Sequence, residues 1–307
     1  MIYTCTITPS IDYTAYLDKF DSGKLNRTEE VYYYPGGKGI NVSRVLSRLG
    51  HKSRALGYAG GFTGKYIEQF LADEGIDTDF IDTGEITRIN VKIKTGQETE
   101  LNGPGPKIDA VQLQELNGKI STMTQGDWFV LAGSLPDSIP MQFFKNLATT
   151  CHEKGIHFVL DTSGSALKQL IDLKPFLIKP NEHELGDIFG VTIQTPADAF
   201  HYAHQLVEQG IEHVIVSMGG AGAIYANKEH GYTAEAPSGK VVNTVGSGDS
   251  LVSGFIASYI KYQDAVRAFQ YGVASGSATA FRTDLCEKQD VEQLLAEVKV
   301  RPFEKRM

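Results

Sequence analysis

The chain has 307 residues, enough for a large core folded as one α/β domain or as two. Hydrophobic residues make up 41% and charged residues 21%, which is ordinary for a globular protein and excludes a disordered one. The formal net charge of −8 argues against general nucleic-acid binding, so an anion site must consist of a few particular residues.

Cysteine spacing, apolar runs and the N-terminal residues indicate the cellular compartment. The three cysteines have no C-x-x-C spacing, no run approaches the ~18 apolar residues of a membrane span, and the N-terminus lacks the pattern of a signal peptide. We therefore expect reduced buried thiols, no membrane partner and a cytoplasmic location.

Residues 2–7 predict a buried strand, and Asp12 follows shortly after its end. Open α/β sheets bind ligands at the carboxyl ends of their strands, so Asp12 is a candidate site residue. A turn-forming aspartate beside Pro9 and Ser10 fits this segment equally well. Residues 13–34 are polar and aromatic without helical periodicity, which favours exposed strands.

A glycine-rich segment, residues 36–39, precedes an amphipathic helix over residues 42–49. Its glycines allow the backbone to approach a ligand closely, while Lys38 and Asn41 offer hydrogen-bond donors. The alternative is a glycine turn with a solvated lysine, although three glycines are more than a turn needs. Residues 60–66 resemble a P-loop but lack its first glycine and its final Ser or Thr, so we interpret them as a loop before a helix.

Residues 86–94 alternate apolar and polar side chains, as a strand with one solvated face does. Arg88, Asn90 and Lys92 share the polar face. An ordinary solvated face and a phosphate-binding face both explain this pattern.

From residue 127 onward, short apolar runs alternate with helical stretches, which predicts a parallel sheet. The expected strands are residues 128–131, 157–160, 176–178 and 214–216. Polar groups follow each strand, and a doubly wound sheet would gather them at one edge. Zinc-protease, hydrolase-elbow and dinucleotide-binding motifs are all incomplete in this chain.

Residues 243–250 include Gly246, Ser247, Gly248 and Asp249, directly before an apolar helical stripe over residues 252–260. Backbone N–H groups at such a glycine-rich helix start form an anion cradle. Asp249 is either a helix cap or a general base, and this segment alone favours neither. A carboxylate base beside an anion cradle is what transfer of a phosphoryl group to a hydroxyl requires.

Four segments in one order resemble the ribokinase/PfkB family of sugar kinases: residues 36–42, 133–136, 179–184 and 246–250. The resemblance runs essentially end to end. It implies one ribokinase-like α/β domain over residues 1–307, with a mainly parallel central sheet flanked by helices. It also implies a small β-sheet lid from approximately residues 11–33 and 87–103. Lids pair in many relatives, so a homodimer through the lid is expected as well.

The resemblance assigns roles to individual residues. Asp249 would be the catalytic base, and the backbone of Gly246, Ser247 and Gly248 would stabilise the transferring phosphoryl group. Substrate binding falls to residues of the first half of the chain: Asp12, Arg27, Gly37, Lys38, Asn41, Arg88 and Ser134. Of these, Lys38, Arg88 and, with weaker support, Arg27 would contact the substrate phosphate. Nucleotide binding falls to Lys179, Ser217, Gly219, Gly220, Gly222 and Gly248.

The implied cofactors are ATP and Mg²⁺. Asn181 and Glu184 match a motif linked to Mg²⁺, through water, because magnesium keeps much of its hydration shell.

Within the family, residues 87–92 and 101–105 resemble the branch that phosphorylates fructose 1-phosphate at its C6 hydroxyl to give fructose 1,6-bisphosphate. The branch that phosphorylates tagatose 6-phosphate is the close alternative. A sugar-phosphate sensor without catalytic activity is the alternative of a different class, although a sensor has no need of a base. Lys38 and Arg88 disfavour a nucleoside kinase, because they suit an acceptor that already carries phosphate.

Overall fold

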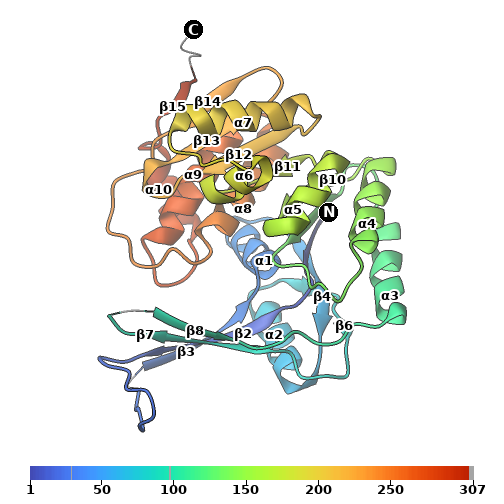
Figure 1. Cartoon of the computed structure of the whole chain (residues 1–307), viewed down its shortest axis with the longest axis vertical. Coiled ribbons are helices and arrows are strands. Elements are labelled where there is room, and N and C mark those ends of the chain that lie inside the picture. Colours follow the sequence, from blue (N-terminus) through green and yellow to red (C-terminus); the bar gives the residue numbers. More distant parts are fainter. Residues whose placement is uncertain (29, 97, 304–307) are drawn as a thin grey trace.

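The structure is a computed structural model that describes residues 1–28, 30–96 and 98–303. A large sheet with helices on both faces forms the body, and a small sheet projects from one side of it (Figure 1). The expected α/β architecture with a small separate sheet is therefore confirmed.

In the described residues the central sheet has the strand order β15-β14-β13-β12-β11-β10-β9-β1-β4-β5, with β6 paired to β4. Its strands are β1 (Ile2–Thr6), β4 (Ser53–Ala59), β5 (Asp77–Thr78), β6 (Ile81–Asp82), β9 (Trp128–Ala132), β10 (His157–Asp161), β11 (Leu177–Ile178), β12 (His213–Ser217), β13 (Ala223–Ala226), β14 (Gly231–Ala234) and β15 (Val300–Pro302). The pairings from β12 through β5 are parallel, as the sequence predicts. The antiparallel edge of β13, β14 and β15 was not predicted.

Helices cover both faces of this sheet. They are α1 (Lys38–Arg48), α2 (Gly61–Asp73), α3 (Ala110–Ser121), α4 (Met141–Glu153), α5 (Gly164–Leu170), α6 (Glu182–Phe189), α7 (Pro196–Glu208), α8 (Ser247–Tyr262), α9 (Ala265–Ala280) and α10 (Lys288–Leu295), with 3₁₀ turns η1 (Ile171–Leu173) and η2 (Gly219–Ala221). The α2 helix begins at Gly61, so the interpretation of residues 60–66 as a loop was wrong. Gly61 has φ +63°, a left-handed conformation that glycine tolerates at the point where the chain enters the helix, and the residues after it already belong to the first helical turn.

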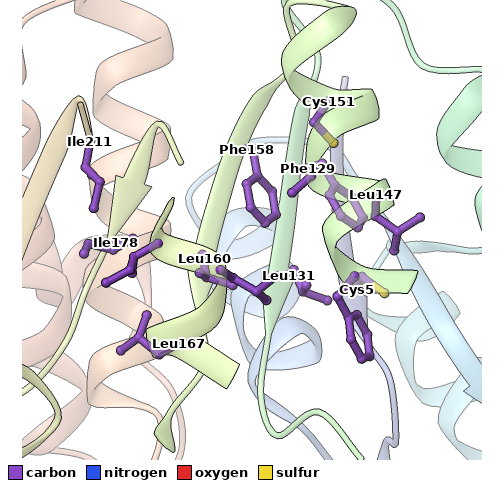
Figure 2. Packing of buried hydrophobic residues seen from close by; sticks show 14 of the residues in the cluster. Cys5, Phe129, Leu131, Leu147, Cys151, Phe158, Leu160, Leu167, Ile178 and Ile211 are labelled. Atoms are coloured by element: carbon purple, nitrogen blue, oxygen red, sulfur yellow. The ribbon is translucent and has the colours of Figure 1, made fainter. Parts of the chain in front are cut away.

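The strand period of two divides the core into two layers. In β9, Phe129 and Leu131 face one side, where they pack with α4 and with Phe158 of β10, as Figure 2 shows. Trp128, Val130 and Ala132 face the other side, toward α1, α8 and α9. Because both faces are covered, each central strand is apolar throughout, which is why short apolar runs predicted these strands well.

The small sheet has the order β3-β2-β7-β8, formed by β2 (Ser10–Tyr16), β3 (Glu30–Gly36), β7 (Ile89–Lys94) and β8 (Glu98–Asn102). Of the two interpretations left open for the polar face of β7, the solvated one was wrong. Asn90 is buried and Lys92 is largely covered, whereas Ile89 on the opposite face is 41% exposed. Lys92 faces a cavity between this sheet and the body, and Asn90 donates to Ser10 and Asp12 on the neighbouring strand, so both polar side chains are shielded.

Cys5, Cys151 and Cys286 are buried and unpaired, as expected. In the part of the chain that the structure describes, none of the helices has the length and apolar character needed to cross a membrane.

Candidate active site

The first turn of α8 presents a glycine-built N-terminus. Gly246 is the N-cap with φ 80°, and a Cβ there would lie 2.5 Å from Leu285, so only glycine fits without a shift. No side chain caps the helix, and the Asp249 carboxylate instead accepts a hydrogen bond from Asn41 Nδ2 at 2.8 Å. The capping interpretation of Asp249 therefore fails, because Gly246 occupies the cap and Asp249 points toward α1.

Asp249 is buried, at 5% exposure, in an electrostatically mixed environment. Burial, followed by the negative charge of Asp161, raises the pKa of Asp249 to about 6. Lys38, Asn41 and Lys179 act in the opposite direction. A carboxyl group with a pKa near neutrality can both accept and release a proton at physiological pH.

Two lysines and a buried aspartate lie next to Asp249. Asp161 Oδ1, at the end of β10, lies 3.1 Å from Lys38 Nζ and 3.7 Å from Lys179 Nζ. Burial of Asp161 opposes its ionisation, but Lys179 and Lys38 together lower its pKa. The charge of Asp161 in turn raises the pKa of Lys38. We call Lys38, Asp161 and Lys179 the lysine–aspartate cluster. It holds two ammonium groups beside the N-terminus of α8, where a Cβ on Gly248 would lie 2.9 Å from Lys179 Nζ.

A first cavity, here called the acceptor cavity, lies between the small sheet and the body. Its walls include Asp12, Thr14 and Lys92 from the sheet and Asn41 from α1. Asp12 is held in place from three directions: Lys92 Nζ lies 3.0 Å from its Oδ2, while Ser10 Oγ and Asn90 Nδ2 donate to its Oδ1. The turn-forming interpretation of Asp12 therefore fails, because Asp12 lies within β2.

A second cavity, here called the donor cavity, has a volume of about 540 Å³. It lies at the N-terminus of α8. Predicted nucleotide-binding residues in its wall are Ser217, Gly219, Gly220, Gly222 and Gly248. A Cβ at Gly222 would lie 1.9 Å from the Ala234 carbonyl oxygen, so the β12–β13 turn requires glycine. The first turn of α8 contributes Ser247 and Gly248 to this cavity, while Asn41, the partner of Asp249, lines the acceptor cavity.

Asn181 and Glu184 form a capping box at the start of α6. Asn181 Oδ1 accepts from the Glu184 N–H at 2.8 Å, and Glu184 Oε2 accepts from the Asn181 N–H at 2.9 Å. This leaves Glu184 Oε1 outside the box. Glu184 also raises the pKa of Lys38, so its charge acts on the lysine–aspartate cluster. Among the described residues, no group of three His, Cys, Asp or Glu side chains could hold a metal alone.

Buried polar atoms without a hydrogen-bond partner concentrate here. Within the described residues, the atoms of this kind near the site are Arg88 Nε, Asn90 Oδ1, Asp161 Oδ2, Thr162 Oγ1 and Ser247 Oγ. Such groups are costly in a folded protein unless a ligand, ion or water satisfies them. The unpartnered Oδ2 atom of Asp161 fits Mg²⁺ that is bound jointly with nucleotide phosphates, since magnesium uses few carboxylates and several waters.

The remaining residues predicted to bind substrate lie in different surroundings. Gly37, with φ 122°, lets α1 start against Thr6, which bonds the Ile40 N–H. Arg88 is half-buried beside β7, and its Nη1 donates to the Gly103 carbonyl at 3.5 Å. Ser134 lies exposed just after β9. Arg27 is exposed in the segment between β2 and β3. Neither Arg27 nor Arg88 belongs to the wall of the acceptor cavity.

From the sequence, Asp161 was assigned no role in the site, and the partner of Lys92 was not identified. Asp161 directly follows a predicted strand, and that position was the available signal, but nothing in its neighbourhood along the chain shows that two lysines converge on it. Lys92 was placed on the polar face of its strand without a partner, and its pairing with Asp12 depends on the β2–β7 register.

Comparison with known proteins is consistent with this geometry. The model for the pfkB family of carbohydrate kinases matches residues 4–291. A 1-phosphofructokinase of Bacillus subtilis (strain 168) is 49% identical over 300 residues, which cover 98% of this chain and 99% of that protein. A D-tagatose-1-phosphate kinase of Bacillus licheniformis is 35% identical over 301 residues, with 98% and 99% covered. The crystal structure of phosphofructokinase-2 from Escherichia coli in complex with fructose-6-phosphate matches with a TM-score of 0.91 and 28% identity, covering 96% of this chain and 98% of that one.

Proposed function

The chain belongs to the pfkB family of carbohydrate kinases, and we propose that it transfers the γ-phosphoryl group of ATP to the C6 hydroxyl of fructose 1-phosphate. The products are fructose 1,6-bisphosphate and ADP. The 49% identity with a 1-phosphofructokinase supports the choice of acceptor. The resemblance of residues 87–92 and 101–105 to the same branch also supports it.

One observation carries the proposal: the first turn of α8 lines the donor cavity and holds a buried carboxylate of raised pKa, and the hydrogen-bond partner of that carboxylate, Asn41, lines the acceptor cavity. A sugar phosphate in the acceptor cavity and a nucleotide in the donor cavity would meet at Asp249. A sensor protein has no use for a carboxylate in that position, so this arrangement favours catalysis over binding alone.

The proposed reaction is a direct displacement. Asp249 accepts the proton of the C6 hydroxyl as the C6 oxygen forms a bond to the γ-phosphorus of ATP. The bond between the γ-phosphorus and the bridging oxygen breaks, and ADP leaves with that electron pair. Asn41 donates to Asp249 Oδ2 and holds the carboxylate in orientation. The Gly248 N–H group at the helix start is suited to the charge on the transferring phosphoryl group. The Ser247 N–H donates to the Thr244 carbonyl at 3.2 Å, so its predicted role requires that this bond breaks when the phosphoryl group binds.

The lysine–aspartate cluster supplies positive charge at the same point. Asp161 holds Lys38 Nζ beside Asp249, so we propose that Lys38 contacts the phosphoryl group during transfer rather than the distal phosphate of the sugar. Lys179, next to Gly248, would contact the nucleotide phosphates. Glu184, Asn181 and Asp161 would hold Mg²⁺, in part through water. When bound, Mg²⁺ would neutralise charge on the triphosphate.

The assay that tests the proposal measures ADP release with Mg·ATP. It compares kcat/KM for fructose 1-phosphate, tagatose 1-phosphate, tagatose 6-phosphate, fructose 6-phosphate and fructose. We expect fructose 1-phosphate to be preferred and unphosphorylated fructose to fail. Preference for a tagatose phosphate would be compatible with the proposed mechanism but would contradict fructose 1-phosphate as the acceptor. The 35% identity with a tagatose-1-phosphate kinase is the reason for including tagatose 1-phosphate. No turnover of any acceptor would favour the sensor.

Arg88 is the proposed ligand of the acceptor phosphate, because its half-buried guanidinium has an unpartnered Nε and burial lowers its pKa. Arg88→Ala should raise KM for the sugar phosphate about tenfold or more, with kcat much less affected. The matched control is Arg54→Ala, at the edge of the central sheet. Arg27→Ala tests the weaker candidate for the same phosphate. A fall in kcat alone for Arg88→Ala would contradict a ground-state phosphate contact.

Asp249 also predicts a pH profile. Because the deprotonated form is the base and its pKa is about 6, kcat/KM should be level above neutrality and fall about tenfold per pH unit below about 6. The acceptor phosphate titrates nearby, so Asp161→Asn serves as the discriminating variant. Loss of the Asp161 charge should lower the pKa of Asp249 and move the acid limb to lower pH. A limb that stays in place in this variant would belong to the substrate.

We propose further that the chain forms a homodimer through the small sheet, which would act as a lid. Tyr33, Tyr13, Val91 and Leu101 form one row across its strands, opposite to the acceptor cavity. Tyr33 is 50% exposed and Leu101 is 60% exposed, an apolar face that a second copy could cover. Leu101→Asp should convert a dimer to a monomer in sedimentation velocity, whereas Val111→Asp, at an even more exposed apolar residue of α3, should not. A wild-type monomer would refute the interface.

A further inference from the structure

A basic cavity lies at the opposite ends of α1 and α8 from the proposed active site. Its volume is about 420 Å³, and its wall includes His51 after α1, Lys261 at the end of α8, Arg267 in α9 and Lys288 at the start of α10. The α1 helix has 11 residues and so separates Lys38 from this cavity by roughly 16 Å. None of its residues lines the acceptor or the donor cavity.

The cationic side chains of this cavity are poorly neutralised. Glu292 is the acidic residue in its wall, and its distance to Lys288 is 3.8 Å, with both side chains more than half exposed. Lys261 and Arg267 contact the ring of Tyr262, and neither forms an ion pair within the described part of the chain. In a protein of net charge −8, this is a local excess of positive charge.

The excess of positive charge affects the pKa of His51. Burial lowers its pKa, and the charges of Lys261 and Lys288 lower it further. The two ammonium groups therefore act on the imidazole even though Glu292 lies near Lys288. An anion bound among these groups would favour the protonated imidazole.

Ser258 in the cavity wall gives a second, independent observation. It is 4% exposed, and its Oγ has no hydrogen-bond partner within the described residues. Away from the active site, the other such atom is His213 Nε2, which lies among the aromatic rings of the core. Ser258 thus places a hydroxyl with unused hydrogen-bonding capacity beside the cationic side chains.

We propose that this cavity binds a phosphate-type dianion, either inorganic phosphate or a small phosphate monoester. A dianion matches several unneutralised cations, and lysine ammonium and arginine guanidinium groups are the side chains that bind phosphate best. The volume exceeds that of one phosphate group, so a small organic portion can be accommodated. This inference does not depend on the acceptor or the reaction proposed above.

His51 is the reporter for the test. Its imidazole resonances, assigned by comparison with His51→Gln, are titrated with pH in the presence of sodium phosphate, glycerol 3-phosphate or sodium chloride at equal ionic strength. We expect phosphate or the monoester to raise the pKa of His51 above its value in chloride. Response to both ligands would show recognition of the phosphate group alone, and response only to the monoester would show that the organic portion is required.

Charge-removing variants locate the site. Lys261→Gln and Lys288→Gln should each weaken binding about fivefold, as loss of one exposed charge contact does, and together they should remove the His51 response. Lys52→Gln is the matched control, because Lys52 is exposed, adjacent to His51 and outside the cavity wall. The proposal is overturned if phosphate and chloride have the same effect on wild-type His51, or if Lys52→Gln weakens binding as much as the cavity variants. The wild-type comparison decides the question even if a variant fails to fold.

Discussion

Replacing Asp249 by asparagine should lower kcat about 10³- to 10⁴-fold while leaving the fold and most ligand binding intact. The amide is nearly the same shape as the carboxylate, and its oxygen can still accept the hydrogen bond from Asn41. It cannot take the proton of the acceptor hydroxyl. Steady-state kinetics would give the loss in turnover, and calorimetry would measure binding of nucleotide and sugar phosphate separately.

The thermal stability of the Asp249→Asn variant distinguishes a catalytic role of Asp249 from a structural one. Because burial and Asp161 raise the pKa of Asp249, its charged form is unfavourable in the folded protein, so Asp249→Asn should melt at the same temperature or higher. Asp79→Asn is the control: it makes the same chemical change at a carboxylate that is 40% exposed and paired with Lys119. A variant that unfolds easily, or that keeps near-normal turnover, would remove Asp249 from the proposed mechanism.

The central sheet was predictable because its strands are buried on both faces. The runs at residues 128–131 and 157–160 are continuous and apolar, and both became strands of nearly the predicted length. The short strand β14, with a mostly half-buried Gly-Tyr-Thr-Ala sequence, has no such pattern, and its pairing depends on long-range contacts. Local sequence therefore predicts the middle of this sheet and not its antiparallel edge.

The candidate site was predictable where a residue type implied a local geometry. Gly246 needs a positive φ at a helix start, and Asp249 follows it in the same turn. By contrast, Asp161 acquires its importance from Lys38, 123 residues away, and Asn90 from Ser10, 80 residues away. The sequence could not decide between a solvated and a phosphate-binding face on β7, because it does not show that the body of the protein lies opposite to that face.

Arg44 shows the same dependence on distant partners, and its replacement is the largest stability change that we expect. It is 2% exposed, and its Nε, Nη1 and Nη2 atoms all donate to the carboxylates of Glu74 and Asp284. Arg44→Met keeps much of the volume but leaves two carboxylates with Arg48 alone. Thermal unfolding should show a loss of about 3 kcal/mol, or a midpoint lower by roughly 5 °C or more. Arg54→Met, at a 3.8 Å exposed ion pair, should change stability little.

The loss should depend on pH in a definite direction. Burial opposes ionisation of Glu74 and Asp284, but Arg44 and Arg48 lower the pKa of both. A lowered carboxylate pKa stabilises the fold above the unfolded value of about 4 and ceases to do so as pH falls through the folded value. The stability difference between wild type and Arg44→Met should therefore be full at neutral pH and shrink below about pH 4.

Arg44 also lines the acceptor cavity, and its guanidinium lies 5.5 Å from the ring centroid of Tyr34 on β3. It could be mistaken for a ligand of the sugar phosphate. Because its donors are already used by two carboxylates, we expect Arg44→Met to lower stability without the selective rise in KM expected for Arg88→Ala. Assays well below the unfolding temperature would separate the two cases. A tenfold rise in sugar-phosphate KM with unchanged stability would mean that Arg44 leaves its carboxylates when the acceptor binds.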